Sequence, residues 1–395
     1  MKGMASSILV VLSLTGMAPA QQEQWLGYRA SADGERVVGS TAGQTLELSE
    51  QKPGDLALPK SAGADALVAK WKTPMVPAGF LWVALGRSAK RGAYDRLFID
   101  SDADGSLEDE SAVSAVDPRI YKGQQSAEFH LVKVLLPGQD GPTTFHLNLR
   151  VWISGRVSRR ILAKAAGWYE GTVKIGGKKH SCVLFDSNAN GTFNDAFAEF
   201  QRSDRIKIDG AGGFAIGRVG KYVQVGDKLH ALEVARDGSF VKFSPPKDLA
   251  LGTVRVSGGV GRLSAGGDKG LLLLRVEEGQ VRLPIGEYRL NHWEIERKDQ
   301  SGRVWKLVAT AATSASTFHV VAGKPAVLDI GEPIVASMSA SRPKPGIHGF
   351  ADPRLDGRSG EHVVLTRAGQ MPPPPLVVIR NADDSYNRHF SFEYG

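Results

Sequence analysis

The chain has 395 residues, of which 42% are hydrophobic and 23% are charged, and its formal net charge is +7. This composition excludes an intrinsically disordered chain, and the length predicts two to four domains rather than one. Its single cysteine, Cys182, excludes an intramolecular disulfide framework.

The chain begins with the features of an export signal. Lys2 supplies a positive charge, residues 8–14 form a short apolar core, and Ala18-Pro19-Ala20 matches a small-x-small cleavage pattern. The alternative, a membrane anchor, is disfavoured because the apolar run is too short to span a bilayer. We therefore expect residues 1–20 to be a signal peptide. The mature chain is expected to be secreted, periplasmic or at the cell surface, with no transmembrane segment.

Strand patterns dominate the mature chain. Only residues 64–72 favour a short helix. Residues 145–153 alternate between apolar and polar side chains, with Trp152 as the exception, and this period of two is typical of a strand with one buried face. Long helices are hard to find, so the sequence predicts an all-β fold.

Glycine-centred turns predict hairpins further along. Residues 172–175 are followed by Gly176-Gly177 and a second apolar run, which is typical of two strands joined by a tight turn. Residues 222–234 repeat this pattern around Gly226-Asp227. Prolines at 245–246 and 343–345 then interrupt the strand pattern and favour linkers.

These breaks predict several linked antiparallel β-sandwich-like domains. The expected divisions are residues 21–160, which hold a first acidic loop, residues 161–246, which hold a second, residues 250–337 and residues 342–395.

Two acidic loops share one spacing. In FIDSDADGSLEDE, residues 98–110, acids occupy positions 1, 3 and 5, glycine position 6 and an apolar residue position 8. This is the first half of a calcium loop, because alternate residues of a tight turn can direct oxygen atoms to one Ca²⁺ ion. The expected ligands of the first loop are Asp100, Asp102, Asp104, the carbonyl of Ser106, and Asp109.

The second loop, in VLFDSNANGTFNDAF (residues 183–197), aligns with the first without gaps. Its expected ligands are Asp186, Asn188, Asn190, Thr192 and Asp195. Because it has only two carboxylates, we expect weaker binding than in the first loop, or a turn held by hydrogen bonds alone. Asn and Asp favour turns even without metal.

The closing ligand is where both loops depart from a full EF-hand, which carries glutamate at position 12. Here position 12 is Ser111 or Phe197, and strands rather than helices precede the loops. The loops resemble the shortened calcium loops of extracellular bacterial proteins, in which an acid near position 10 completes the shell. That resemblance implies Asp109 and Asp195, with Glu108 and Glu110 as alternatives in the first loop.

Two larger resemblances follow. Residues 167–243, with their Gly-Trp-Tyr-Glu-Gly start, Leu-Phe-Asp loop and Asp-Arg-Ile-Lys-Ile-Asp strand, resemble a group of secreted, β-rich bacterial proteins with EF-hand-like loops and no known activity. The turn Leu283-Pro284-Ile285-Gly286-Glu287-Tyr288 resembles the β-sandwich modules of transthyretin and of carboxypeptidase regulatory domains. These resemblances imply export, calcium and a β-sandwich over residues 250–337.

No motif marks an enzyme or a nucleic-acid-binding protein. The chain has no His-Glu-x-x-His sequence, and Gly357-Arg358-Ser359-Gly360 lacks the spacing of a nucleophile elbow. The sequence therefore favours an exported calcium-binding protein with a structural, adhesive or binding role and an extracellular protein or polysaccharide as its partner. The alternatives are a secreted hydrolase acting on carbohydrate and a non-catalytic carbohydrate-binding protein.

Overall fold

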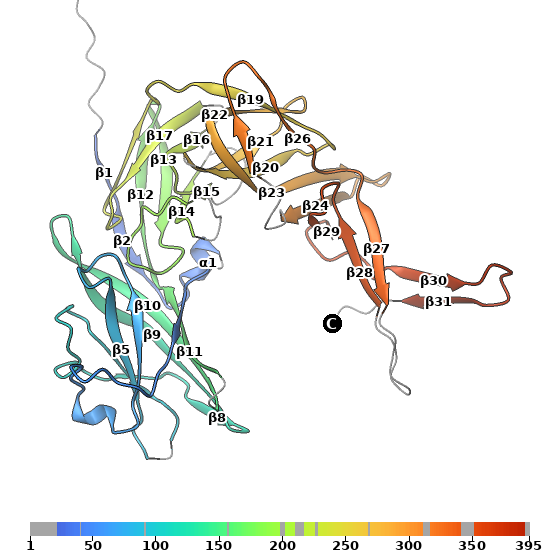
Figure 1. Cartoon of the computed structure of the whole chain (residues 1–395). Coiled ribbons are helices and arrows are strands. Elements are labelled where there is room, and N and C mark those ends of the chain that lie inside the picture. The colour runs from blue at the N-terminus through green and yellow to red at the C-terminus, as the bar shows by residue number, and fades with distance from the viewer. Residues whose placement is uncertain are drawn as a thin grey trace, which may run out of the picture.

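The described part of the chain is nearly all β, as predicted (Figure 1). Its only helical turns are α1 (Glu35–Val38) and the 3-10 turn η1 (Lys60–Ala62), and it contains no helix long and apolar enough to cross a bilayer. The expected signal peptide lies outside it. A computed structural model describes residues 22–39, 41–90, 92–155, 158–197, 202–209, 217–225, 228–267, 269–310, 317–340 and 351–391.

The longest strands form a five-stranded antiparallel sheet in the order β3-β11-β10-β9-β8. The predicted alternation over residues 145–153 is confirmed, because odd-numbered residues are buried and even-numbered residues, including Trp152, lie on the other face. The strands are β3 (Gln44–Glu47), β8 (Arg119–Tyr121), β9 (Gln124–Gly138), β10 (Gly141–Ser154) and β11 (Ser158–Ala165).

Three further antiparallel sheets complete the first lobe, which we define as residues 22–244. Their orders are β4-β5-β6-β7, β15-β14-β13-β12-β2 and β1-β18-β17-β16. The strands are β1 (Gln24–Trp25), β2 (Gly27–Ala30), β4 (Leu67–Lys72), β5 (Phe80–Gly86), β6 (Arg96–Ile99), β7 (Val113–Ser114), β12 (Gly167–Ile175), β13 (Lys178–Phe185), β14 (Arg205–Ile208), β15 (Gly217–Arg218), β16 (Tyr222–Val225), β17 (Lys228–Val234) and β18 (Phe240–Ser244).

The helix expected at residues 64–72 is wrong, because residues 67–72 form strand β4. This strand pairs antiparallel with β5, and Trp71 is fully buried between the exposed Lys70 and Lys72. Hydrogen bonding to β5 and burial of Trp71 outweigh the weak local preference for a helix.

Both predicted hairpins are confirmed. Strands β12 and β13 pair antiparallel around Gly176 and Gly177, whose φ angles of 57° and 83° are those of a type I′ turn. Strands β16 and β17 also pair antiparallel, although their connecting residues 226–227 lie outside the described residues.

One hydrophobic core spans the first lobe, from Leu26 to Val241. The expected division between residues 160 and 161 falls inside strand β11, which pairs with β10 on one side and β3 on the other. The first two strands of the lobe also pair with strands on the other side of this division, β2 with β12 and β1 with β18. The two acidic loops therefore belong to one folded unit.

The second lobe, residues 251–391, has a second hydrophobic core that runs from Val254 to Val363 and also includes Tyr222 from strand β16 of the first lobe. It combines the sheet β22-β19-β26 with an eight-stranded sheet that continues through β28 and β29, past the expected division between residues 337 and 342. Strands β30 and β31 form a separate hairpin that projects from this lobe (Figure 1). The strands are β19 (Leu251–Val256), β20 (Arg262–Gly267), β21 (Gly270–Arg275), β22 (Gln280–Pro284), β23 (Gly286–Lys298), β24 (Val304–Thr310), β25 (Thr317–Val320), β26 (Ala326–Leu328), β27 (Val335–Ala340), β28 (Ala351–Asp356), β29 (His362–Arg367), β30 (Leu376–Arg380) and β31 (Asn387–Ser391).

Candidate metal centre

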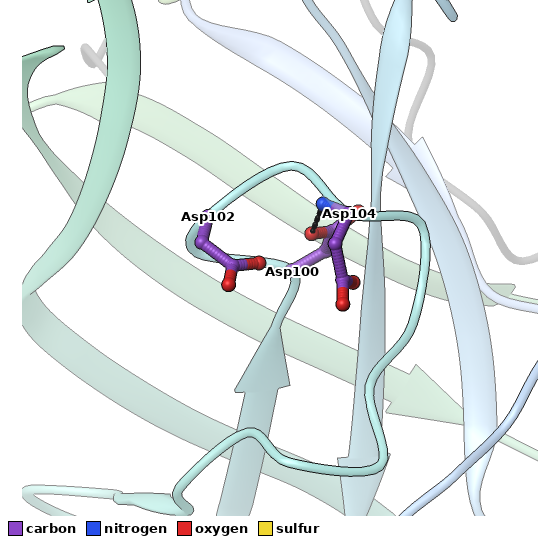
Figure 2. Close-up of side chains that lie close together, drawn as sticks. All are labelled: Asp100, Asp102 and Asp104. Atoms are coloured by element: carbon purple, nitrogen blue, oxygen red, sulfur yellow. Dashed lines mark hydrogen bonds between the residues drawn. The ribbon is translucent and has the colours of Figure 1, made fainter.

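The first acidic loop follows strand β6 directly. Asp100 is the residue after the strand, and its backbone N–H donates to the carbonyl of Trp82 on the neighbouring strand β5, at 3.0 Å. The strand thus fixes the start of the loop, and Figure 2 shows the side chains of Asp100, Asp102 and Asp104 converging inside its curve.

These three aspartates form a candidate cation site. One carboxylate oxygen from each lies within 4.8 Å of the others, and this is the only such group of three His, Cys, Asp or Glu residues within the described ranges. Asp100 is 2% exposed, whereas Asp102 and Asp104 are exposed. The predicted convergence of positions 1, 3 and 5 is therefore confirmed, with one carboxylate buried at the base and two open to solvent.

The backbone turns sharply within the first loop. Asp100 accepts hydrogen bonds from the N–H groups of Asp104 and Gly105, both at 3.1 Å. Ala103 and Gly105 have φ angles of 65° and 87°, and such positive values favour glycine, which is found at the second of the two positions. These bonds hold the carboxylate of Asp100 inside the turn.

Leu107, at position 8 of the loop, returns the chain to the protein interior. Its side chain is fully buried in a small third core with Val68, Ala84 and Phe98. Its backbone N–H donates to the carbonyl of Ala57 at 3.0 Å. The loop therefore fastens the segment before η1 to the sheet of β4, β5 and β6.

Charge repulsion accumulates in the first loop. Burial raises the pKa of Asp100 to about 6, and the negative charges of Asp104 and Asp102 add to this effect. Hydrogen bonds from the Gly105 and Asp104 amides oppose it. A bound cation would favour the ionised form of all three carboxylates and offset their repulsion.

Of the residues expected to complete the first shell, Ser106 adjoins the three-aspartate group, because its backbone N–H donates to Oδ1 of Asp104 at 2.7 Å. Asp109 is exposed and is not a member of that group. The Oγ atom of Ser106 accepts the N–H of Glu108 at 3.0 Å. Glu110 turns back toward the start of the loop and accepts hydrogen bonds from the N–H and the hydroxyl of Ser101.

The second loop follows strand β13 and repeats the backbone of the first. Ala189 and Gly191 have φ angles of 54° and 86°, at the same loop positions as Ala103 and Gly105. Asp186 accepts the N–H of Gly191 at 2.7 Å, as Asp100 accepts that of Gly105. The similarity predicted from spacing thus extends to the conformation.

The surroundings of the second loop are different, because it lies inside the first core. Asp186 is fully buried and Phe193, at position 8, is 1% exposed, with its ring 5.1 Å from that of Tyr169 and 6.1 Å from that of Phe145. The indole N–H of Trp71 donates to the carbonyl of Ala189 at 2.7 Å. Strands β4, β10 and β12 thus enclose the loop.

Side-chain amides replace two of the carboxylates here. Asn188 and Asn190 each donate from Nδ2 to Oδ2 of Asp195, both at 2.7 Å. Thr192 donates from its hydroxyl to Oδ1 of Asn190 at 2.6 Å. Asp195 is thus brought to the loop, as predicted, and the polar side chains are partly satisfied by one another.

Asp204 is a member of this cluster that the sequence analysis did not select. It lies directly before strand β14, is fully buried, and accepts the N–H of Ser187 at 3.0 Å and that of Asp195 at 2.8 Å. The only signal in the sequence was its place at the start of the Asp-Arg-Ile-Lys-Ile-Asp strand.

Burial dominates the electrostatics of the second loop. It raises the pKa of Asp186 to about 8, and the charge of Asp195 contributes. It also raises the pKa of Asp204 well above its usual range, with contributions from the charges of Asp186 and Asp195. The buried carboxylates of Asp186 and Asp204 and the half-buried carboxylate of Asp195 therefore repel one another when ionised.

An exposed row of tryptophans, which would favour sugar binding, is missing from the described residues. Only Trp25 and Trp152 among the tryptophans there are more than a third exposed, and they lie on different sheets. Ser264 and His292 approach to 2.7 Å, but Ser264 is fully buried. No protein-family model, no curated protein and no solved structure matches the chain.

Proposed function

We propose that the protein is an exported calcium-binding β-rich protein with a structural, adhesive or binding role outside the cytoplasm. The observation that carries the proposal is the three-aspartate group, Asp100, Asp102 and Asp104, whose oxygen atoms lie within 4.8 Å of one another. The signal-like start of the sequence supports export. An extracellular protein or a polysaccharide is the partner class that fits this location.

The donor chemistry favours calcium over other cations. The loop offers only oxygen ligands, and exposed carboxylates at its rim leave room for water, which suits a hard cation with six to eight ligands. Zinc sites are usually built with Cys or His, and neither occurs in residues 98–110.

Calcium in the first loop would act on stability. The ion would fix Asp100, Asp102 and Asp104, while Leu107 in the same loop holds its place in the third core. Ligand that binds only the folded state raises stability, by about 2.7 kcal/mol at a free calcium concentration one hundred times Kd. We therefore infer that calcium stiffens this edge of the first lobe.

Calorimetric titration of the calcium-free mature chain tests this proposal, with melting temperature followed in parallel. We expect binding heat and a raised melting temperature, both weakened at the first loop in Asp104→Asn. The matched control is Asp140→Asn, an exposed aspartate in the turn between β9 and β10, which should behave as the wild type. No heat and no thermal shift with the wild type would refute the proposal.

A further inference from the structure

Each loop has a carboxylate that accepts the backbone N–H of loop position 2. In the first loop this residue is Glu110, which accepts from the N–H and hydroxyl of Ser101. In the second it is Asp204, whose Oδ1 accepts the N–H of Ser187 at 3.0 Å. Glu110 and Asp204 therefore make equivalent contacts with loop position 2, although they differ in sequence position.

Asp204 reaches the second loop from outside it. Its backbone N–H donates to the carbonyl of Asp195 at 2.9 Å, and its Oδ2 accepts the N–H of Asp195 at 2.8 Å. With the bond from Ser187, these contacts hold the carboxylate of Asp204 at the base of the loop, close to Asp186. An oxygen that accepts one N–H retains a second lone pair for a cation.

Asp186 supplies independent evidence for a ligand-binding atom at this site. It is fully buried, and its Oδ2 accepts the N–H of Gly191. The N–H groups of Ala189 and Asn188 also lie near the carboxylate, but its Oδ1 makes no hydrogen bond of ordinary geometry among the residues that the structure describes. Buried polar atoms are almost always satisfied, and a buried carboxylate oxygen left without a partner is costly. A cation at Oδ1 would satisfy it.

Asp195 has a different role from Asp204. Its Oδ2 accepts two amide N–H groups, from Asn188 and Asn190, which uses both lone pairs of that oxygen. These bonds orient the two asparagines within the loop. Asp195 is therefore a positioning residue for Asn188 and Asn190.

We propose that Asp204 is the closing ligand of a buried cation site in the second loop, as Glu110 is in the first, in place of the aspartates at position 10. This inference rests on the proposed calcium function and assigns the ligands of the same sites. The second site then combines Asp186 and Asp204 with oxygen atoms of Asn188 and Thr192, whereas Oδ1 of Asn190 already accepts the N–H and the hydroxyl of Thr192. We therefore expect the second site to bind calcium more tightly than the two carboxylates of its loop sequence alone would predict.

The test isolates the second site in the full mature chain. Asp102→Ala, an exposed change, disables the first loop and serves as the parent for calcium titration by calorimetry. In that parent, Asp204→Asn should weaken calcium binding at least tenfold. The matched change Asp195→Asn, made in the same cluster with the same chemistry, should weaken it less than threefold.

The outcomes separate the two proposals. Absence of calcium binding by the wild type would refute the calcium function itself. A wild type that binds calcium only at the first loop, or an Asp204→Asn variant that binds as tightly as the parent, would overturn the role of Asp204 alone. If Asp204→Asn does not fold, Asp204→Glu keeps the charge but displaces the carboxylate, and an unchanged affinity in that variant would also overturn the assignment.

Discussion

The two acidic loops have one backbone and two environments. Positive φ angles occur at the same positions, and Asp100 and Asp186 accept equivalent N–H groups. The first loop, however, exposes Asp102 and Asp104 to solvent, whereas the second lies within the first core. The local sequence thus determines the turn, while the surroundings determine how much its ionised carboxylates destabilise the folded protein.

This difference explains the residues at positions 3 and 5. Water can hydrate the carboxylates of the first loop when no cation is present, so Asp102 and Asp104 are tolerated. In the enclosed second loop, Asn188 and Asn190 keep the oxygen donors but carry no charge. Their amide groups also satisfy Asp195. The asparagines therefore allow the second loop to be buried with fewer charged side chains than the first loop has.

The largest expected difference in stability between the two loops comes from substitutions at loop position 8. Phe193→Ala should reduce the free energy of unfolding by about 4 kcal/mol, because its ring packs against Phe145 and Tyr169 in the large core. Leu107→Ala should cost about 2 kcal/mol, because the third core is small. Urea unfolding measures both. A larger loss for Leu107→Ala would contradict the view that the second loop is the more deeply integrated.

Substitution of the glycines at loop position 6 should give the next largest difference in stability between the two loops. An added Cβ at Gly191 would lie 2.6 Å from Cδ1 of the buried Leu136, whereas nothing lies within 4 Å of one at Gly105. Both substitutions strain a positive φ angle, but only the first also overpacks the core. We expect losses of about 3 kcal/mol for Gly191→Ala and about 1 kcal/mol for Gly105→Ala in the same unfolding assay. Equal losses would show that the core adapts to the new methyl group.

Stability of the calcium-free chain should fall as pH rises. The folded pKa values of Asp100 and Asp186 are about 6 and about 8, above the ordinary value of 3.8, so the folded state holds these protons more tightly than the unfolded state. The stabilisation is complete below pH 4 and is lost as pH rises through 6 and 8. We expect the melting temperature to drop by roughly 5 °C between pH 5 and pH 8.

Calcium should remove this pH dependence, because an ion that binds ionised carboxylates favours their deprotonation in the folded state. Melting curves at both pH values, with calcium and after its removal, provide the comparison. A calcium-free chain that gains stability toward pH 8 would contradict the burial of these charges. Asp100→Asn should reduce the drop and Asp140→Asn should leave it unchanged.

The smallest expected effect concerns two neighbouring acids of the first loop. Glu110→Gln should weaken calcium binding about tenfold, since Glu110, although outside the three-aspartate group, turns back to accept the N–H and hydroxyl of Ser101 and lies near enough to Asp102 for their charges to interact. Asp109→Asn should change it less than about threefold, since Asp109 is exposed and outside the three-aspartate group. Calorimetry distinguishes them, and the reverse order would restore Asp109 as the closing ligand.

The first loop was predictable because its spacing places its own residues around one centre. The β10 strand and the two hairpins were predictable for the same reason, since period and turn chemistry are local. Asp204 was not, because it joins the second loop from a separate strand and only tertiary structure brings it to Ser187. Likewise, strand β4 exists because β5 pairs with it, and a single core crosses residues 160–161 because β11 pairs on both sides.

A crystal structure of the mature chain grown with calcium tests the central claim most directly. The account predicts anomalous density inside the first loop, with oxygen atoms of Asp100, Asp102 and Asp104 about 2.3–2.6 Å from the ion. A second peak beside Asp186 and Asp204 would extend the account to the buried loop. The opposite result would contradict the account: both loops ordered in crystals grown with millimolar calcium, but only water between the three aspartates.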